Sequence, residues 1–381
     1  MNQRAVESMT VLENTCQSPR TKAILELAKE RRIQDRTIRA ADNSEHSIPE
    51  YAMQLLCYAS IIGCFKEEDT ESGLMIAMLL AMEISKDDFW SYGSKLMNDV
   101  SKRKIAVTRK EWEAVMAQYG TNATNPDKEY LLENNLMAAA FHCADLMTRI
   151  LSLTGRSGIP ASQMPEPVRK KLEACWEGGP VNTISHLAET FLPAYLGAEV
   201  FSRTVKPMLD GMIKNRSLEA PAMLNSDKSM KQSIAEHVTS VVWYYADVFK
   251  PQTETDIGKL FLAALCLDLR KTCDYQMCYG TRKKFCAEGR YSEPDRRKFN
   301  WEQYIQYEEN NQIHLAQNKS LFMATRYLQG ELPDAIASAI DSCSYNLDMN
   351  EFVEVQMMEE PLGLYLRVAN IVASAYLAAT K

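Results

Sequence analysis

Apolar residues recur at a spacing of three and four along most of this sequence, which is the pattern of amphipathic helices. Between residues 21 and 40, for example, Ile24, Leu27 and Ala28 share one face, and charged side chains occupy the rest. Sustained alternation with a period of two is absent, and no segment repeats. Glycine and proline are sparse, at 15 and 14 residues in 381, so tight turns are too few for a β-sandwich or barrel. The sequence therefore predicts an all-α protein.

The predicted helices run through the whole chain. Ser47-Ile48-Pro49-Glu50 has the form of an N-terminal cap with proline in the first turn, and an apolar helix is expected after it. The expected helices cover residues 21–40, 51–65, 73–84, 87–97, 109–119, 129–153, 182–191, 231–249, 255–275, 301–317, 321–328, 333–343 and 361–379.

Breaks in this pattern predict two helical lobes joined by a hinge, with an arm at each end. Residues 215–230 combine Asn, Ser, Pro and charged side chains, and are the best candidate for the hinge. Few apolar residues lie in 1–20, so this segment is expected to be disordered or ordered by a partner surface. The expected organisation is an N-terminal arm (1–20), an N-terminal lobe (21–214), the hinge (215–230), a C-terminal lobe (231–360) and a C-terminal helix or arm (361–381).

No targeting or membrane-spanning segment is evident. The polar start, Met1-Asn2-Gln3-Arg4, lacks the apolar core of a signal peptide. The longest apolar stretch, Gly73–Met82, is about half of the roughly 20 residues that a spanning helix needs. Ten cysteines in a long chain without a secretory signal indicate reduced thiols. An intracellular, reducing location is therefore expected.

Motifs for catalysis, metals or cofactors are absent. Cys273, Cys278 and Cys286 lack a nearby fourth ligand, so zinc is not predicted. The acidic segment Glu67–Glu71 superficially resembles the magnesium-binding box of terpene synthases, but a solvated turn between helices fits it better. No Gly-rich phosphate loop or nucleophile motif occurs. The five histidines have no second ligand at a spacing typical of helical metal motifs; they are His46, His142, His186, His237 and His314.

Basic residues are concentrated in a few segments of an acidic chain. The formal net charge is −7, from 43 Lys and Arg against 50 Asp and Glu. Residues 270–298 nevertheless hold nine basic and four acidic residues, interleaved with aromatic ones such as Tyr279 and Phe285. Because phosphates pair with basic groups and bases stack on aromatic rings, this pattern favours single-stranded nucleic acid. A solvated charged face is the alternative interpretation.

Two of the three basic groups flank the predicted hinge, where a cleft is expected. The third group, Lys102–Lys104 with Arg109 and Lys110, lies far from the hinge in the sequence. The predicted RNA-binding residues are Arg203, Lys206, Lys214, Arg216, Arg270, Lys271, Arg282, Lys283, Lys284, Arg290, Arg296 and Arg297.

This plan resembles the nucleoproteins of nonsegmented negative-strand RNA viruses, including those that infect fungi. The resemblance is carried by the polar arm Met1–Arg20, the hinge Asn215–Met230, the basic groups on both sides, and the terminal helix Pro361–Lys381. It implies a non-enzymatic protein that clamps single-stranded RNA in a basic cleft between lobes and forms homo-oligomers through its terminal arms. It also implies a place in the virion or host cytoplasm, with a viral polymerase or phosphoprotein as candidate partners.

Two other functions stay open from the sequence. One is a helical viral coat or scaffold protein with little RNA binding. The other is an all-α enzyme whose site lies in the helices of 129–270 and uses a carboxylate such as Asp145 or Glu189. Binding ranks above catalysis because the sequence offers no positioned acid–base or metal group.

Overall fold

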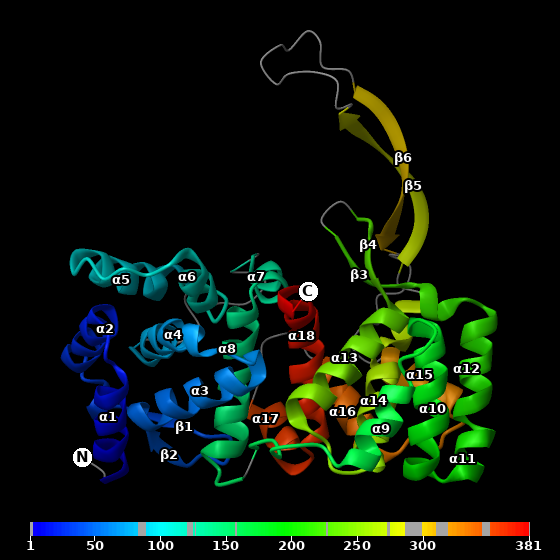
Figure 1. The fold of residues 1–381 in the computed structure, drawn as a ribbon, viewed down its shortest axis with the longest axis horizontal. Coiled ribbons are helices and arrows are strands. Elements are labelled where there is room, and N and C mark those ends of the chain that lie inside the picture. Colours follow the sequence, from blue (N-terminus) through cyan, green and yellow to red (C-terminus); the bar gives the residue numbers. More distant parts are fainter. Residues whose placement is uncertain are drawn as a thin grey trace. The chain divides into compact units, whose positions relative to one another are not determined.

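A computed structural model describes residues 3–82, 89–119, 125, 127–156, 158–225, 228–272, 275–285, 299–309, 319–344 and 351–380. Most of these residues are helical, which confirms a mainly α-helical fold (Figure 1). The described part also contains six strands, which the sequence did not predict, paired as three antiparallel hairpins. No helix in these ranges combines the length and the apolarity that crossing a membrane requires.

The chain forms two compact units, each built from separate stretches of sequence. Unit 1 comprises Met1–Lys170, Ser240–Ala264 and Pro333–Lys381, and unit 2 comprises Lys171–Thr239 and Leu265–Leu332. The segment 215–230, which was expected to be a hinge, lies inside unit 2. It contains a 3-10 turn, Ser217–Glu219, and most of a β-hairpin. The predicted lobe boundaries at this segment therefore do not coincide with the boundaries of the units.

The core of unit 1 is a set of apolar helices. Every residue of α4 (Thr70–Met82) from Gly73 to Met82 is buried, and so is every residue of α8 (Leu136–Met147) from Ala138 onward. Helices that are apolar all round belong in a core. The remaining elements of this unit include β1 (Thr37–Arg39), β2 (Glu45–Ser47), α3 (Ile48–Gly63), α5 (Phe89–Lys102), α6 (Arg109–Met116), α7 (Lys128–Asn134), α16 (Asp334–Ser344) and α17 (Glu351–Glu359).

Both terminal segments pack within unit 1. Helix α1 (Gln3–Thr15) contacts α3, and its buried residues Ala5, Met9 and Leu12 lie on one face. Three apolar residues at helical spacing are enough to dock this helix, although the composition of 1–20 is polar. Helix α18 (Leu362–Thr380) contacts α7, α8 and α16. The structure thus places the two predicted arms against the protein's own core.

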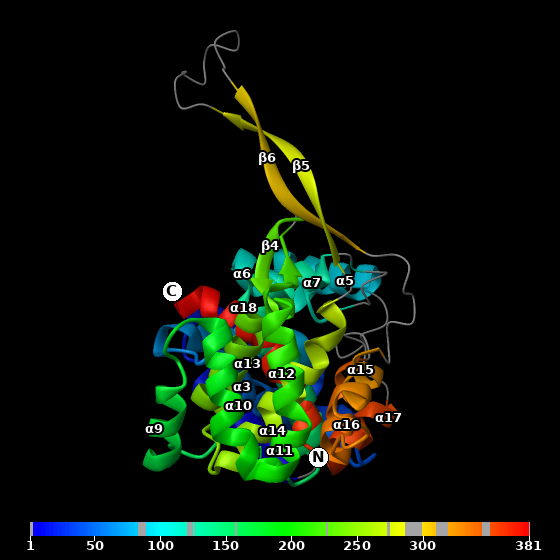
Figure 2. The ribbon, with the colours of Figure 1, turned by 90° about the vertical axis from the view of Figure 1, so that its right-hand side faces the viewer.

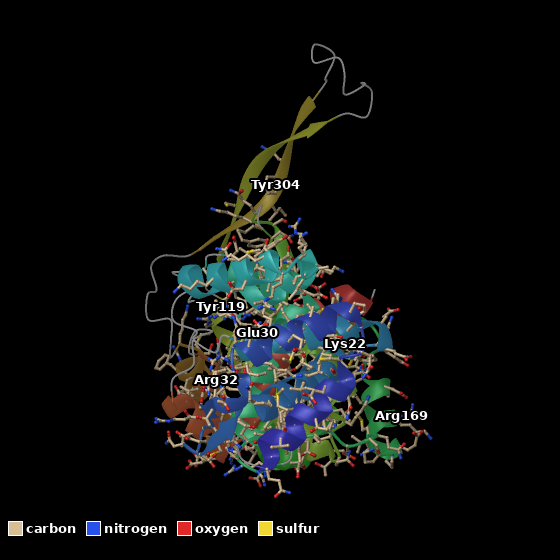
Figure 3. The ribbon with its side chains drawn as sticks, turned by 90° about the vertical axis from the view of Figure 1, so that its left-hand side faces the viewer. Lys22, Glu30, Arg32, Tyr119, Arg169 and Tyr304 are labelled. Atoms are coloured by element: carbon tan, nitrogen blue, oxygen red, sulfur yellow. The ribbon has the colours of Figure 1, made fainter. Side chains whose placement is uncertain are left out.

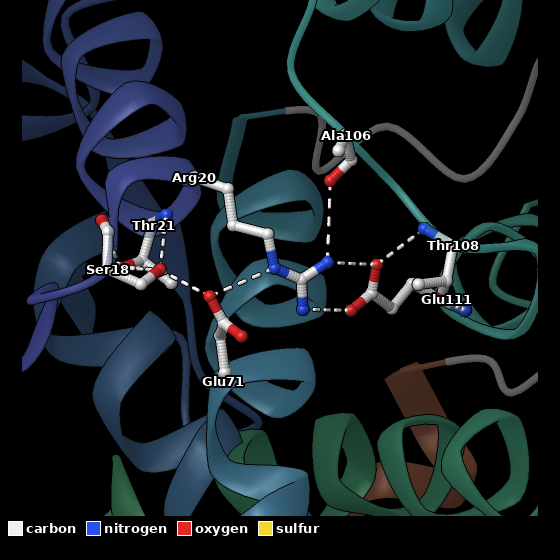
Figure 4. A network of polar contacts seen from close by, with 7 residues as sticks. All are labelled: Ser18, Arg20, Thr21, Glu71, Ala106, Thr108 and Glu111. Carbon is white, nitrogen blue, oxygen red and sulfur yellow. Dashed lines mark hydrogen bonds and ion pairs between the residues drawn. The ribbon is translucent and has the colours of Figure 1, made fainter.

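A polar network joins α2 (Pro19–Glu30) to α4 and α6 in unit 1 (Figure 4). The Arg20 guanidinium donates to both carboxylate oxygens of Glu111, at 2.8 and 3.1 Å, and pairs with Glu71 through Nε at 3.0 Å. Glu111 also accepts the backbone N–H of Thr108, at 2.7 Å, in a capping box. The Arg20 guanidinium therefore connects three helices through two carboxylates, of which that of Glu111 is buried.

The long helix predicted over 129–153 is interrupted. Asn135 has extended backbone angles (φ −130°, ψ 104°), and its side chain accepts the N–H of Ala138 to cap α8. Asparagine favours such local caps over the helix interior. Beyond α8 the chain continues in a π-helical segment, Thr148–Ser152.

The described residues of unit 2 include four α-helices and two hairpins that lie entirely within its bounds. The helices are α10 (Pro180–Leu196), α11 (Ala198–Arg203), α12 (Val205–Lys214) and α15 (Lys319–Tyr327). Hairpin β3–β4 pairs Pro221–Leu224 with Met230–Ser233, and hairpin β5–β6 pairs Tyr275–Phe285 with Phe299–Glu309. Helices α9 (Glu166–Ala174), α13 (Ile234–Phe249) and α14 (Glu254–Asp268) each contain a boundary between the units.

The β5–β6 hairpin corrects two predicted helices. Residues 301–309, expected as part of a helix over 301–317, form β6, and the helix expected to reach 275 ends at Asp268; residues 310–317 lie outside the described ranges. Aromatic side chains in this segment suit a strand, and the pairing with β5 decides its conformation. Figures 1 and 2 show this ribbon extending beyond the helices of unit 2. Near its base, the Tyr307 N–H donates to the carbonyl of Lys228, at 3.0 Å.

Candidate nucleic-acid interface

Three of the predicted RNA-binding residues before 217 are paired with carboxylates. All three cations and their partners are exposed to a large extent. Exposed ion pairs contribute only about 0–1 kcal/mol, so exchanging a carboxylate for a phosphate costs little. The pairs are Arg203–Glu331, Lys206–Glu189 and Arg216–Glu219.

Lys271 and Arg270 lie in the 3-10 turn Leu269–Thr272, which directly follows α14. The ammonium of Lys271 lies 2.7 Å from Oδ1 of buried Asp268. The other oxygen, Oδ2, faces Nε2 of His237 at 3.8 Å. This buried group ties the 3-10 turn to α13 and α14, so Lys271 has a structural partner. Arg270 is half-buried.

The most basic predicted stretch lies on strand β5. In the hairpin register, Arg282, Lys283 and Lys284 are opposite Glu302, Trp301 and Asn300, respectively. The acidic residues Glu308 and Glu309 pair with the other end of β5, so the loop end of the ribbon is the basic one. Tyr304, on β6, is labelled in Figure 3. The further predicted residues Arg290, Arg296 and Arg297 lie outside the described part of the chain.

A cleft in unit 2 is lined by residues of α12 and α15 and of the turns that follow them. Its volume is about 330 Å³. Along α12 the lining positions follow helical spacing, which places them on one face of that helix. The cleft is lined by Thr204, Pro207, Met208, Gly211, Met212, Asn215, Ser217, Arg326, Tyr327 and Gln329.

Left-handed residues shape the polar part of this cleft. Arg216 (φ 55°) turns the chain after α12, and Gln329 (φ 53°) does the same after α15. Non-glycine residues adopt this conformation uncommonly. The two turns bring Asn215, Ser217 and Gln329 to the cleft. The ends of two helices that lie far apart in the sequence therefore supply its amide and hydroxyl groups.

Two cations beside the cleft lack a carboxylate partner among the described residues. Lys214 is exposed at the end of α12, one turn beyond Gly211, and Arg326 is exposed in the last turn of α15. Next to Arg326, the side chain of Tyr327 is 45% exposed. Lys214 was predicted from the sequence. Arg326 and Tyr327 were not, because a single Arg-Tyr pair in a helix carries no signal without knowledge of what packs beside it.

The two carboxylates considered for an enzyme have other contacts. Asp145 is buried, accepts the hydroxyl of Tyr51 at 2.6 Å, and pairs with Arg149 at 3.2 Å. Arg149 also pairs with the buried Glu354. The other candidate, Glu189 on α10, is exposed and pairs with Lys206. In the ranges that the structure covers, no three His, Cys, Asp or Glu side chains are placed to hold a metal ion.

No protein-family model, curated protein or solved structure matches this chain.

Proposed function

We propose that this protein is a viral nucleoprotein that binds single-stranded RNA through its phosphates, independently of base sequence, and assembles with copies of itself on the RNA. The observation that carries the proposal is Arg326, which lines a cleft beside the exposed ring of Tyr327, together with Lys214, which directly precedes the lining residue Asn215. Cations without carboxylate partners are available to phosphates, and an exposed aromatic ring is available to a base. The basic residues on β5 provide a second group of phosphate contacts in the same unit.

Arg203, Lys206 and Arg216 are paired with carboxylates in the free protein, so we expect them to bind phosphates only after Lys214 or Arg326 has done so. A phosphate approaching Lys214 or Arg326 can also displace a carboxylate from Arg203, because both members of the Arg203–Glu331 pair are accessible. Such exchanges keep the number of ion pairs constant and release counterions from the RNA. The interface therefore extends over α11 and α12 without requiring a strongly basic surface in the free protein.

We propose that the protein assembles with copies of itself, but through a surface other than residues 1–20 or 361–381. Since α1 and α18 pack in unit 1, deleting residues 1–20 would remove buried Met9 and Leu12 from the core. Light scattering of the full chain with and without RNA is the better measurement. Particles that grow with RNA length support the nucleoprotein, whereas the same particles without any bound RNA support a coat or scaffold protein.

The test of RNA binding is fluorescence anisotropy with a labelled single-stranded RNA over a range of salt concentrations. The double variant Lys214→Ala/Arg326→Ala should lower the steepness of log affinity against log salt by about 1.4, from about 0.7 per phosphate contact on a single strand. The matched control is Lys22→Ala/Lys110→Ala, which removes two exposed lysines from α2 and α6 of unit 1; Lys22 is labelled in Figure 3. Equal losses in both variants would contradict the placement of the interface.

The ribbon is tested in the same way. Replacing Arg282, Lys283 and Lys284 with alanine should lower the slope by up to about 2.1. The corresponding control replaces Lys102, Arg103 and Lys104, which lie at the end of α5 and just after it. Of these, Arg103 pairs with Glu30, and both side chains are exposed. A loss in the control as large as in the ribbon variant would exclude the ribbon as a specific contact.

A further inference from the structure

We infer that the cleft between α12 and α15 receives one base of the bound RNA, stacked on Tyr327. This inference rests on the proposed RNA binding and adds a base site to it. Phosphate contacts do not require a cleft, whereas the apolar, amide and hydroxyl groups that line this one can contact the ring and the polar edge of a nucleobase.

The shape and the apolar surface of the cleft suit a planar ring. A volume of about 330 Å³ falls at the lower end of the range for small-molecule sites. Pro207, Met208 and Met212 provide apolar surface, and methionine adapts readily to flat aromatic partners. Tyr327 adds an exposed ring on the side of α15. Base–aromatic stacking contributes about 1–3 kcal/mol for each base.

The polar lining can accept any base. Asn215 and Gln329 each carry an amide that donates and accepts, and the hydroxyl of Ser217 does both as well. Within the described residues, the side chains of these three make no hydrogen bond to the protein, so their groups are available to a ligand. Because an amide can rotate to exchange donor and acceptor, the site tolerates different base edges. This matches the sequence independence of the proposed function.

Arg326 lines the cleft, and Lys214 directly precedes the lining residue Asn215. Lys214 belongs to α12, and Arg326 to α15. A base that enters the cleft carries a phosphate on each side of its sugar, so Arg326 in the lining and Lys214 beside it can each meet one of these phosphates. The same two residues that indicate phosphate binding would therefore also help to position the base in the cleft.

Gly211 provides a steric probe of the cleft. It lines the cleft in the interior of α12, where glycine costs about 0.5–1 kcal/mol relative to alanine. A Cβ added there would meet no described heavy atom within 4 Å. A leucine at this position would therefore extend into the cleft without displacing the helix, and would occupy the space assigned to the base.

The experiment compares two oligomers of equal length and charge, a single-stranded RNA and an abasic ribose-phosphate chain. The wild-type protein should bind the RNA about 5- to 150-fold more tightly, which corresponds to one stacked base. Gly211→Leu and Tyr327→Ala should lose most of this preference and keep the salt slope, whereas Gly211→Ala and Tyr327→Phe should retain the preference. Circular dichroism establishes that each variant is folded.

The outcomes separate this inference from the proposed function. Equal binding of both oligomers by the wild-type protein, with a steep salt slope, would overturn the base site and leave RNA binding intact. A wild-type preference that survives in both Gly211→Leu and Tyr327→Ala would also overturn it, because the base would then bind elsewhere. Binding of neither oligomer would contradict the proposed function itself.

Discussion

Replacing Glu111 with glutamine tests how burial decides the strength of an ion pair in unit 1. Arg20 contacts two carboxylates, of which the side chain of Glu111 is fully buried and that of Glu71 is 43% exposed. The change Glu111→Gln removes the charge but keeps the size of the side chain. The same change at Glu71 is the control, because it removes a carboxylate from the same guanidinium.

The expected magnitudes follow from these exposures. Removing one partner of a buried ion pair costs about 3–5 kcal/mol. The Arg20 side chain is 21% exposed and keeps its contacts with Glu71 and the carbonyl of Ala106, so the lower end, about 3 kcal/mol, is expected for Glu111→Gln. Exposed pairs contribute about 0–1 kcal/mol, which sets the expected loss for Glu71→Gln.

The pH dependence gives an independent check. Burial raises the pKa of Glu111, but hydrogen bonds from Arg20, Ser72 and the Thr108 backbone outweigh it, so the pKa lies below its ordinary value. A lowered pKa in the folded state contributes stability that is present above the unfolded value and is lost as the pH falls through the folded value. The difference between wild type and Glu111→Gln should thus be full at neutral pH and shrink below about 4.3.

The assay is urea unfolding of the full chain, followed by circular dichroism at several pH values. We expect the unfolding midpoint of Glu111→Gln to fall markedly at neutral pH and that of Glu71→Gln to stay close to wild type. Equal losses in the two variants would refute the argument from burial. If the stability difference between wild type and Glu111→Gln stayed constant in acid, the charge of Glu111 would not be its source.

The same unfolding assay tests other contacts. Arg149→Met should lose about 3–5 kcal/mol of unfolding free energy, because two buried carboxylates would lose their counterion. Gly211→Ala should gain about 0.5–1 kcal/mol, since its Cβ enters open space, whereas Gly63→Ala should lose stability because its Cβ would lie 2.2 Å from the ring of Phe65. In peptide mapping by mass spectrometry, iodoacetamide should modify exposed Cys64 but spare Cys143 until urea is added, because burial raises the pKa of the Cys143 thiol to about 12; modification of native Cys143 would contradict its burial.

Local signals predicted several elements of this fold. The Ser47 side chain accepts the N–H of Glu50 at the start of α3, with Pro49 in the first turn, as the sequence indicated. The continuous apolar run Gly73–Met82 forms a buried helix, because ten apolar or small residues in a row leave no polar face. The β5–β6 ribbon was missed because strand pairing joins residues far apart in the sequence, such as Tyr275 and Glu309. The sequence of each strand lacks the sustained alternation of apolar and polar residues that would predict it.

The candidate interface was predictable only in part. Lys214 lies in a basic group that the sequence shows, and the Arg216–Glu219 pair follows from a spacing of three residues. The partner of Arg203, by contrast, is Glu331, more than a hundred residues away in the chain. The cleft is lined by α12 and α15, which lie far apart in the sequence, so only the fold shows that Arg326 and Tyr327 belong to it.

The most direct test of the central claim is the salt dependence of RNA binding by the unmodified protein. If Lys214, Arg326 and the three basic residues of β5 each contact one phosphate, log affinity should fall against log salt with a slope of about −3.5 between about 50 and 200 mM. The slope should be the same for RNAs of different base sequence. A flat dependence, or affinity for one sequence alone, would contradict the account.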